Sequence, residues 1–249
     1  MIENIEDKEI KINISNELFK IPDDIKRKII GFWNETTNRN PTLWNGNLMC
    51  VSSYESLENE LVITCKKTSY AHYLYDERKD VANEYACHSL SAGCLLETSD
   101  HYYIVGELDK KTSYPRCLQP CGGIVEKSDL ENGEISIIKT ISREAKEELN
   151  IDLQNRNQVL ESKIKYISLP DNKVHTYIIF MKSLLKMTKL EVEEQYKKYL
   201  QDLKMNNGEV EFCKLHFIKK DNISEQLDKL NNPKRGYLIE LLDADSKVK

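Results

Sequence analysis

Residues 119–126 read QPCGGIVE, and residues 135–149 read ISIIKTISREAKEEL. The second stretch predicts a helix, because its apolar residues recur at spacings of three and four. One edge of this helix should pack into a core, and it is formed by Ile138, Ile141, Ala145 and Leu149. At about 100° per residue, three carboxylates fall on the neighbouring edge within one arc of about 100°: Glu144, Glu147 and Glu148.

The three carboxylates favour a divalent cation. Two unit charges about 5 Å apart repel by about 3 kcal/mol at an effective dielectric of about 20. Hard Mg²⁺ takes carboxylate oxygens and fills its other positions with water and substrate phosphates, so it would offset this repulsion. A solvated acidic face, paired with Arg143 and Lys146, is the alternative and stays open at this stage.

The strand, the Gly-Gly pair, the polar loop and the helix together resemble the Nudix box. That pattern is Gly, five residues, Glu, seven residues, then Arg-Glu-apolar-any-Glu-Glu-any-Gly-apolar. Gly123, Glu134 and residues 143–151 fill it here, although ten residues separate Gly123 from Glu134 and eight separate Glu134 from Arg143. Asn150 stands in place of the last Gly, and Asn also adopts the left-handed conformation that ends a helix. Cys121 lies between Pro120 and the two glycines.

The resemblance implies an α+β fold, a Nudix-type α/β/α sandwich with a mixed β-sheet. It also implies a metal-dependent pyrophosphatase that uses Mg²⁺ or Mn²⁺ and acts on a nucleoside diphosphate linked to another group. By position, the metal ligands would be Gly123 through its carbonyl, Glu144, Glu147 and Glu148. Arg143 would orient the glutamates through a salt bridge.

The general base has more than one candidate. Glu148 is the first, and Glu209 or Glu211 in a later predicted strand is the second. For this later pair, a surface-facing alternation in the strand is the competing interpretation. The catalytic set expected from the sequence is therefore Glu148, Arg143 and Glu209.

A second resemblance, over most of the chain, is to the UDP-glucose pyrophosphatase branch of the family. It depends on short segments in a shared order: residues 32–44, Thr68-Ser69-Tyr70, Tyr199-Leu200 and residues 234–239. It implies a nucleotide sugar as substrate, with ADP-ribose, a dinucleotide, capped RNA or a non-catalytic sensing module as alternatives. Tyr70 and Arg116 are the expected substrate-binding residues. Tyr70, His72 and Tyr73 would otherwise be aromatic core.

Composition limits the classes of partner. The chain has 249 residues and a net charge of −5, so no basic field is available for a nucleic acid. No stretch of about 20 apolar residues predicts a bilayer span, and the charged N-terminus is unlike a signal peptide. Seven scattered cysteines predict reduced thiols in a cytoplasm. A small molecule is the expected partner, and a homodimer stays open.

The predicted organisation is an N-terminal extension over residues 1–85 and a Nudix domain over residues 86–249. The extension should hold a helix, ended by Asn40-Pro41, and a β-hairpin. In the second part, strands are expected over residues 89–96, 101–106, 116–119, 163–169, 174–183 and 209–218. Helices are expected over residues 135–149 and 190–205, with two more split at Asn232-Pro233.

Overall fold

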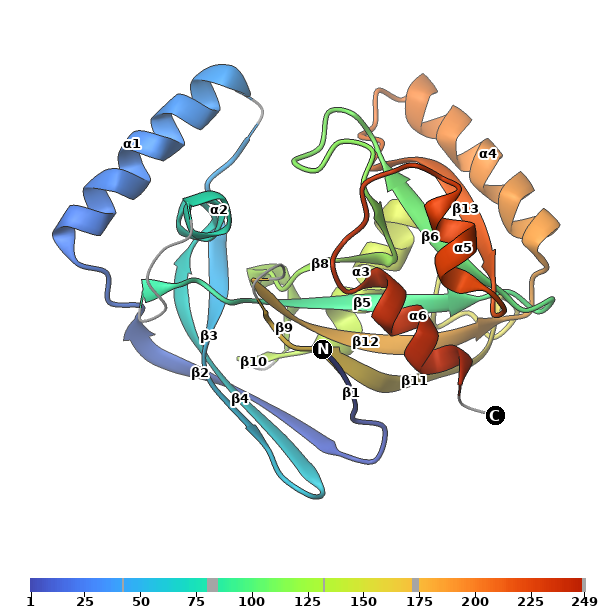
Figure 1. Cartoon of the computed structure of the whole chain (residues 1–249), viewed down its shortest axis with the longest axis horizontal. Helices are drawn as coiled ribbons and strands as arrows, with labels where there is room; N and C mark the ends of the chain where they lie inside the picture. Colours follow the sequence, from blue (N-terminus) through green and yellow to red (C-terminus); the bar gives the residue numbers. More distant parts are fainter. Residues whose placement is uncertain (42, 80–84, 132, 172–174, 248–249) are drawn as a thin grey trace.

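A computed structural model describes residues 1–41, 43–79, 85–131, 133–171 and 175–247. It has an α+β fold around one mixed sheet, which confirms the predicted class (Figure 1). The main path of the sheet follows this strand order: β1 (Ile2–Asn4), β11 (Val159–Ser168), β12 (Thr176–Leu185), β5 (Ser89–Glu97), β3 (Asn47–Ser56), β4 (Glu60–Ser69) and β2 (Glu9–Leu18). The β12–β5 and β2–β4 pairs are parallel, and the other pairs along this path are antiparallel.

Further strands branch from the central strand β5. β8 (Cys121–Ile124) pairs with the middle of β5. β6 (Tyr102–Leu108) pairs with the end of β5, and both β7 (Leu118–Gln119) and β13 (Phe212–Lys219) pair with β6. A separate hairpin joins β9 (Leu130–Glu131) to β10 (Glu134–Ile135). The helices are α1 (Asp23–Arg39), α2 (Tyr70–Lys79), the 3₁₀ turn η2 (Lys127–Asp129), α3 (Ile137–Leu149), α4 (Lys189–Met205), α5 (Ile223–Asp228) and α6 (Leu238–Ser246).

Two cores lie on opposite faces of β5, because successive side chains of a strand point to opposite sides. Ala92 and Cys94 join the core that contains Ile141 and Ala145 of α3. The side chain of Leu95 points to the opposite face and joins the core formed with α5 and α6. The same alternation in β12 places Ile179 in the α3 core and Phe180 in the other. Helices therefore cover both faces of the sheet, as the sandwich expectation required (Figure 1).

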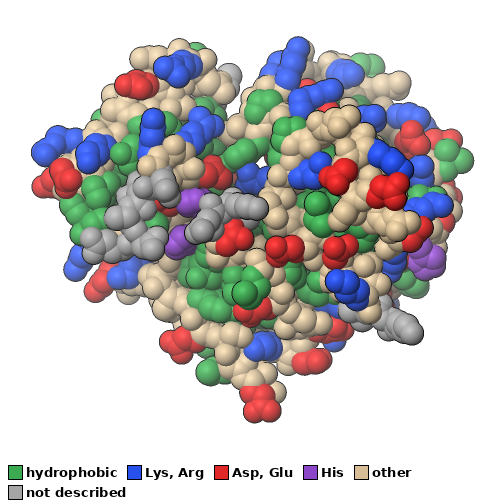
Figure 2. Space-filling view, viewed as in Figure 1, with side chains coloured by type: hydrophobic (Ala, Val, Ile, Leu, Met, Phe, Trp, Pro, Cys, Tyr) green, Lys and Arg blue, Asp and Glu red, His purple; other side chains and the backbone are tan. Residues whose placement is uncertain are grey.

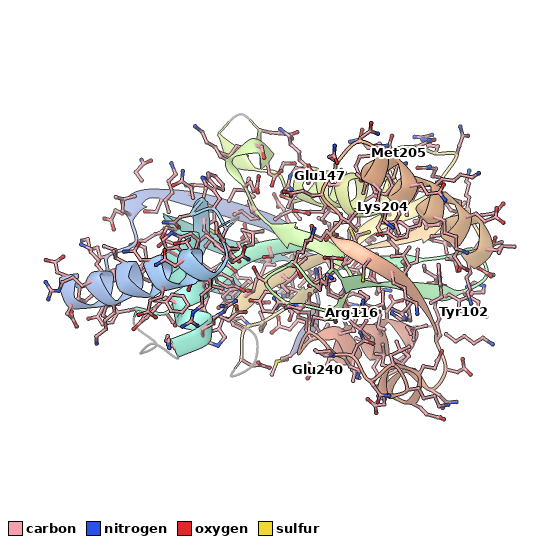
Figure 3. The ribbon with its side chains drawn as sticks, turned by 90° about the horizontal axis from the view of Figure 1, so that it is seen from above. Tyr102, Arg116, Glu147, Lys204, Met205 and Glu240 are labelled. Carbon is pink, nitrogen blue, oxygen red and sulfur yellow. The ribbon has the colours of Figure 1, made fainter. Side chains whose placement is uncertain are left out.

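The region predicted as an N-terminal extension reaches both ends of the sheet. β1 pairs with β11, whereas β3 joins the start of β5, where Val51 N–H donates to His88 O at 2.8 Å. Viewed from above, α1 lies at the end of the molecule opposite α4 (Figure 3). The space-filling view is hollowed between the part carrying α1 and α2 and the part carrying α5 and α6 (Figure 2). The division at residue 85 stays a prediction, since residues 80–84 are outside the described residues.

Several element bounds follow the sequence and others differ; β11 begins at Val159, four residues before the predicted Lys163. The helix begins at Ile137 rather than Ile135, because residues 130–135 form the β9–β10 hairpin where a polar loop was expected. The last strand begins at Phe212, so Glu209 precedes it. β12 begins at Thr176, while the predicted start, Val174, is outside the described residues. In the described parts of the chain, no helix combines the length and apolarity that crossing a bilayer requires.

Candidate active site

Helix α3 is fixed at both ends by local interactions. The Ser136 hydroxyl accepts a hydrogen bond from Lys139 N–H, which satisfies one free donor of the first turn. Asn150 ends the helix in the left-handed region at φ 54°, and its N–H donates to carbonyls of the last turn. The buried edge holds Ile141, Ala145 and Leu149, as predicted. Ile138 is 53% exposed, and Ile137 is buried instead, which corrects one position of the predicted stripe.

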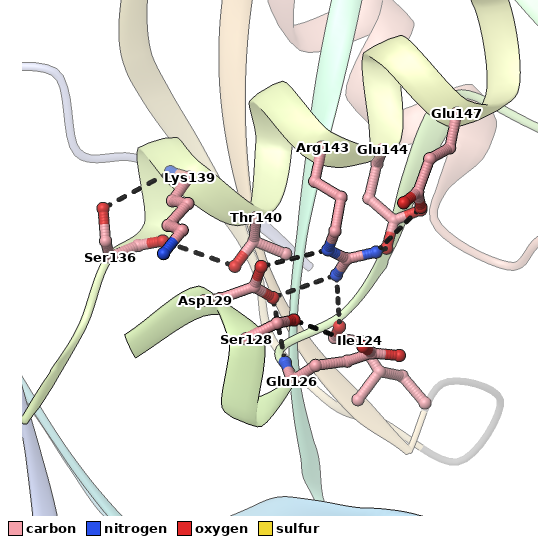
Figure 4. A network of polar contacts seen from close by, with 10 residues as sticks. All are labelled: Ile124, Glu126, Ser128, Asp129, Ser136, Lys139, Thr140, Arg143, Glu144 and Glu147. Atoms are coloured by element: carbon pink, nitrogen blue, oxygen red, sulfur yellow. Dashed lines mark hydrogen bonds and ion pairs between the residues drawn. The ribbon is translucent and has the colours of Figure 1, made fainter. Parts of the chain in front are cut away.

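Arg143 connects the carboxylates of α3 to the preceding turn (Figure 4). Its guanidinium donates to both oxygens of Asp129, with Nε–Oδ1 at 3.0 Å and Nη2–Oδ2 at 2.9 Å. Nη1 donates to Glu144 Oε1 at 2.8 Å and to Glu147 Oε2 at 3.1 Å. A fork of this kind fixes the position of each acceptor, so Arg143 orients two of the three glutamates.

Asp129 takes the place that the sequence had given to Glu134. Five residues separate Gly123 from Asp129, which is the spacing of the Nudix pattern. Thirteen residues then separate Asp129 from Arg143, six more than the pattern has, and the hairpin of residues 130–135 accounts for those six. Glu134 lies exposed in that hairpin, outside the network of Figure 4. Counting five residues from Gly123 would have found Asp129 in the sequence.

Asp129 is fully buried and remains an acceptor. Its Oδ2 accepts the Glu126 N–H at 2.9 Å as well as the arginine. Burial alone would raise the pKa of Asp129, but the Arg143 guanidinium and the Glu126 N–H lower it below its ordinary value. The aspartate is therefore a charged anchor for Arg143.

The two glycines let strand β8 lie directly against the carboxylates. A Cβ on Gly123 would lie 2.2 Å from Glu144 Oε1, and a Cβ on Gly122 would lie 2.5 Å from Ala92 O. Gly122 also has a φ of 149°, which L side chains rarely adopt. Its N–H donates to Glu148 Oε2 at 2.8 Å. The Gly-Gly pair thus brings backbone donors and carbonyls to the edge of α3.

Glu148 is the most enclosed carboxylate of the cluster, at 2% exposure. Among the described residues, its Oε1 has no hydrogen-bond partner. Burial, with the nearby charges of Glu211 and Glu144, raises the pKa of Glu148. Burial raises the pKa of Glu144 to about 7, although Arg143 opposes this. A cluster in which negative charge is this costly favours a neighbouring cation.

The donors of this cluster suit a divalent metal in kind but are not arranged around an ion. Among the described residues, no three His, Cys, Asp or Glu side chains are grouped closely enough to hold an ion as they stand. Arg143 binds Glu144 and Glu147, and the Gly122 N–H binds one oxygen of Glu148. The free Oε1 of Glu148 and the oxygen-only ligands nevertheless fit Mg²⁺ or Mn²⁺ chemically. Gly123, Glu144, Glu147 and Glu148 stay the expected ligands.

We expect the melting temperature in excess chelator to fall as the pH rises from about 5 to about 8. The folded-state pKa values of Glu144 and Glu148 lie above the unfolded value of about 4.3, so the folded state binds these protons more tightly. This proton binding adds to the free energy of unfolding at pH values below the pKa of the unfolded state. The added free energy is lost as the pH rises through the pKa of the folded state, which is about 7 for Glu144. Glu148→Gln should flatten this slope, whereas a slope of the opposite sign in the wild type would contradict the burial of these carboxylates.

A cavity of about 510 Å³ opens beside the cluster, within the size range of small-molecule sites. Glu144, Glu147 and Glu211 line it on one side. Residues of the N-terminal part line the other side, among them Trp44 and Tyr70. The Tyr70 hydroxyl is 3.2 Å from Ser113 Oγ, and its ring packs edge-on against Trp33.

Three of the predicted site residues are not among the described lining residues: Glu148, which is buried, Arg116 and Glu209. Arg116 is paired with Glu107, Nε–Oε1 at 2.9 Å, and lies well apart from Glu147 in Figure 3. Glu209 is exposed before β13, whereas Glu211 lines the cavity. The sequence also gave no role to Arg235, which lines the cavity from the segment of residues 234–239.

No protein-family model and no curated protein sequence matches this chain. Solved structures with similar folds include DR0079 from Deinococcus radiodurans, at 14% identity, over 61% of this chain and 80% of that chain, with a TM-score of 0.42. A NUDIX hydrolase from Nitrosomonas europaea is 15% identical over 63% and 86%, with a TM-score of 0.38. The NUDIX domain of Shewanella oneidensis NrtR, complexed with ADP ribose, is 11% identical over 73% and 100%, with a TM-score of 0.39. Values this low establish neither a substrate nor an activity for this chain.

Proposed function

We propose that this chain is a metal-dependent Nudix pyrophosphatase, which hydrolyses a nucleoside diphosphate linked to another group. One observation carries the proposal. Arg143, anchored by Asp129, holds Glu144 and Glu147 beside the buried Glu148, next to the Gly122-Gly123 pair and at the side of a cavity. A merely solvated acidic face would not bury Glu144 and Glu148 at their own electrostatic cost.

The residues of the chain would act as follows. Glu144, Glu147, Glu148 and the Gly123 carbonyl hold Mg²⁺ or Mn²⁺, and Arg143 orients the first two. The bound metal neutralises the diphosphate and lowers the pKa of the attacking water. Glu148 is the first candidate to accept the proton of that water, because it lies in the carboxylate cluster and its Oε1 has no hydrogen-bond partner among the described residues. Glu211 is the second candidate for the base, because it lines the cavity and Glu209 does not.

The substrate is a small molecule bound between the carboxylates and the cavity wall that the N-terminal part contributes. A nucleotide sugar such as UDP-glucose, cleaved to UMP and sugar 1-phosphate, is the first compound to assay. ADP-ribose, a dinucleotide or a capped RNA end would use the same chemistry. Tyr70 lies on the cavity wall contributed by the N-terminal part and contacts the nucleoside or sugar. A cytoplasmic location stays a prediction.

The test is release of nucleoside monophosphate from a panel of these diphosphate compounds, first in excess chelator and then with Mg²⁺ or Mn²⁺. We expect no turnover in chelator and recovery with either metal, because the diphosphate charge is otherwise uncompensated. Undiminished turnover after removal of tightly bound metal would contradict the metal-dependent mechanism. Substrate binding without turnover at any metal concentration would support a sensing module instead.

A further inference from the structure

Arg235 is a partly buried cation on which the Glu77 carboxylate acts electrostatically. Its guanidinium carbon lies 4.1 Å from the centre of the Tyr114 ring, and the guanidinium donates a hydrogen bond to the Tyr237 side chain. Within the described part of the chain, it forms no ion pair with an Asp or Glu. By contrast, Arg143 and Arg116 are both paired with carboxylates. A partly buried guanidinium that lacks a close ion pair is suited to an anion from outside the chain.

Arg235 lies between two cavities. The first is the cavity beside the carboxylate cluster, and the second, of about 530 Å³, shares Ser113, Tyr114 and Arg235 with it. A ligand that starts at Glu147 can therefore extend past Arg235. Lys and Arg side chains border the hollow in the space-filling view (Figure 2).

The second cavity is predominantly basic. Arg78, Lys234 and Arg235 line it, with Glu77 as its one acidic residue among the described lining residues. Glu77 already accepts hydrogen bonds from the Tyr73 and Tyr114 hydroxyls. Lys234 Nζ donates to the Asn232 carbonyl at 3.2 Å and has only a long contact, 3.7 Å, to the exposed Asp228. Within the described residues, the positive charge of this cavity is thus incompletely compensated.

We propose that the substrate carries a further acidic group, remote from its diphosphate, and that Arg235 binds this group together with Lys234 and Arg78. The acidic group is a carboxylate or a phosphomonoester, since a guanidinium fork matches the geometry of both. Stacking on Tyr114 holds the guanidinium plane in place and leaves its edge to donate. This assignment rests on the proposed pyrophosphatase function of the neighbouring cluster and narrows its substrate class.

Two matched pairs of compounds test the proposal. UDP-glucose and UDP-glucuronate differ by one carboxylate, and ADP-ribose and its 2′-phosphate differ by one phosphomonoester. We expect kcat/KM at least about tenfold higher for the acidic member of one pair, the effect of one charge-assisted hydrogen bond or more. The pair that shows this preference identifies the acidic group. Equal kcat/KM within both pairs overturns the proposal.

Variants separate binding of the acidic group from a structural role. Arg235→Gln should raise KM for the acidic member at least about tenfold and leave the neutral member within about threefold, and Arg235→Lys should restore part of the difference. Lys234→Gln tests the same preference with less risk to folding, and the exposed Arg156→Gln is the matched control. An equal loss on both members would mean that Arg235 binds the diphosphate or is structural, which overturns the proposal. Tighter binding of the acidic member without any turnover would instead refute the pyrophosphatase function alone.

Discussion

The Glu148→Gln variant is expected to turn over its diphosphate substrate at least about 100-fold more slowly than the wild type. Gln keeps the shape of the side chain and an acceptor for the Gly122 N–H, but it cannot accept the proton of water or offer a charged ligand. Turnover is measured at saturating Mg²⁺ or Mn²⁺ with the best substrate of the panel. The exposed Glu194→Gln in α4 is the matched control and should leave the rate unchanged.

Stability should move in the opposite direction in the same variant. Glu148 is 2% exposed, and its negative charge is opposed by burial and by Glu211. In chelator, the free energy of unfolding should therefore stay the same or rise by up to about 2 kcal/mol. Loss of activity together with loss of stability would indicate that Glu148 is a structural residue.

Asp129→Asn is expected to destabilise the fold by about 3 kcal/mol, the usual effect of breaking a buried ion pair by removing one partner. The side chain of Arg143 is only 20% exposed, and the substitution removes its anchoring charge. Arg143 is then free to shift toward Glu144 and Glu147. Turnover should fall as well, because the orientation of both glutamates depends on Arg143. Denaturant unfolding and turnover of the same preparation measure the two effects.

Glu134→Gln is the control for Asp129→Asn, because the resemblance to the Nudix box first assigned this position to Glu134. It is exposed in the β9–β10 hairpin, so its substitution should change the free energy of unfolding by less than about 0.5 kcal/mol. If Glu134→Gln were the damaging substitution and Asp129→Asn were neutral, the assignment of the arginine anchor would be wrong.

Local patterns predicted the central helix well. Its apolar spacing, its Ser136 cap and its Asn150 end all depend on residues within α3 or next to it, so the sequence contains that information. The same holds for α1, which ends before Asn40-Pro41, and for the separation of α5 from α6. The three glutamates fall on one edge of α3 for the same local reason.

The errors occur where pairing between strands decides the structure. The hairpin of residues 130–135 displaced Glu134, since its pairing and the bond from Ser136 N–H to Asp129 O hold it outside the helix. Glu211 rather than Glu209 lines the cavity because β13 starts at Phe212 and pairs with β6. Arg235 reaches the cavity through the pairing of its segment with Leu118, which lies more than 100 residues earlier. No local periodicity records such contacts.

Calorimetric titration of the metal-free protein with Mn²⁺ tests most directly whether the Glu144–Glu148 edge of α3 is a metal site. We expect saturable binding by the wild type, and binding at least about tenfold weaker in Glu148→Gln, since a site with fewer charged ligands has lower affinity. Arg156→Gln, remote from the cavity, should bind like the wild type. No saturable binding by the wild type, or equal affinity in Glu148→Gln, would contradict the assignment of this cluster.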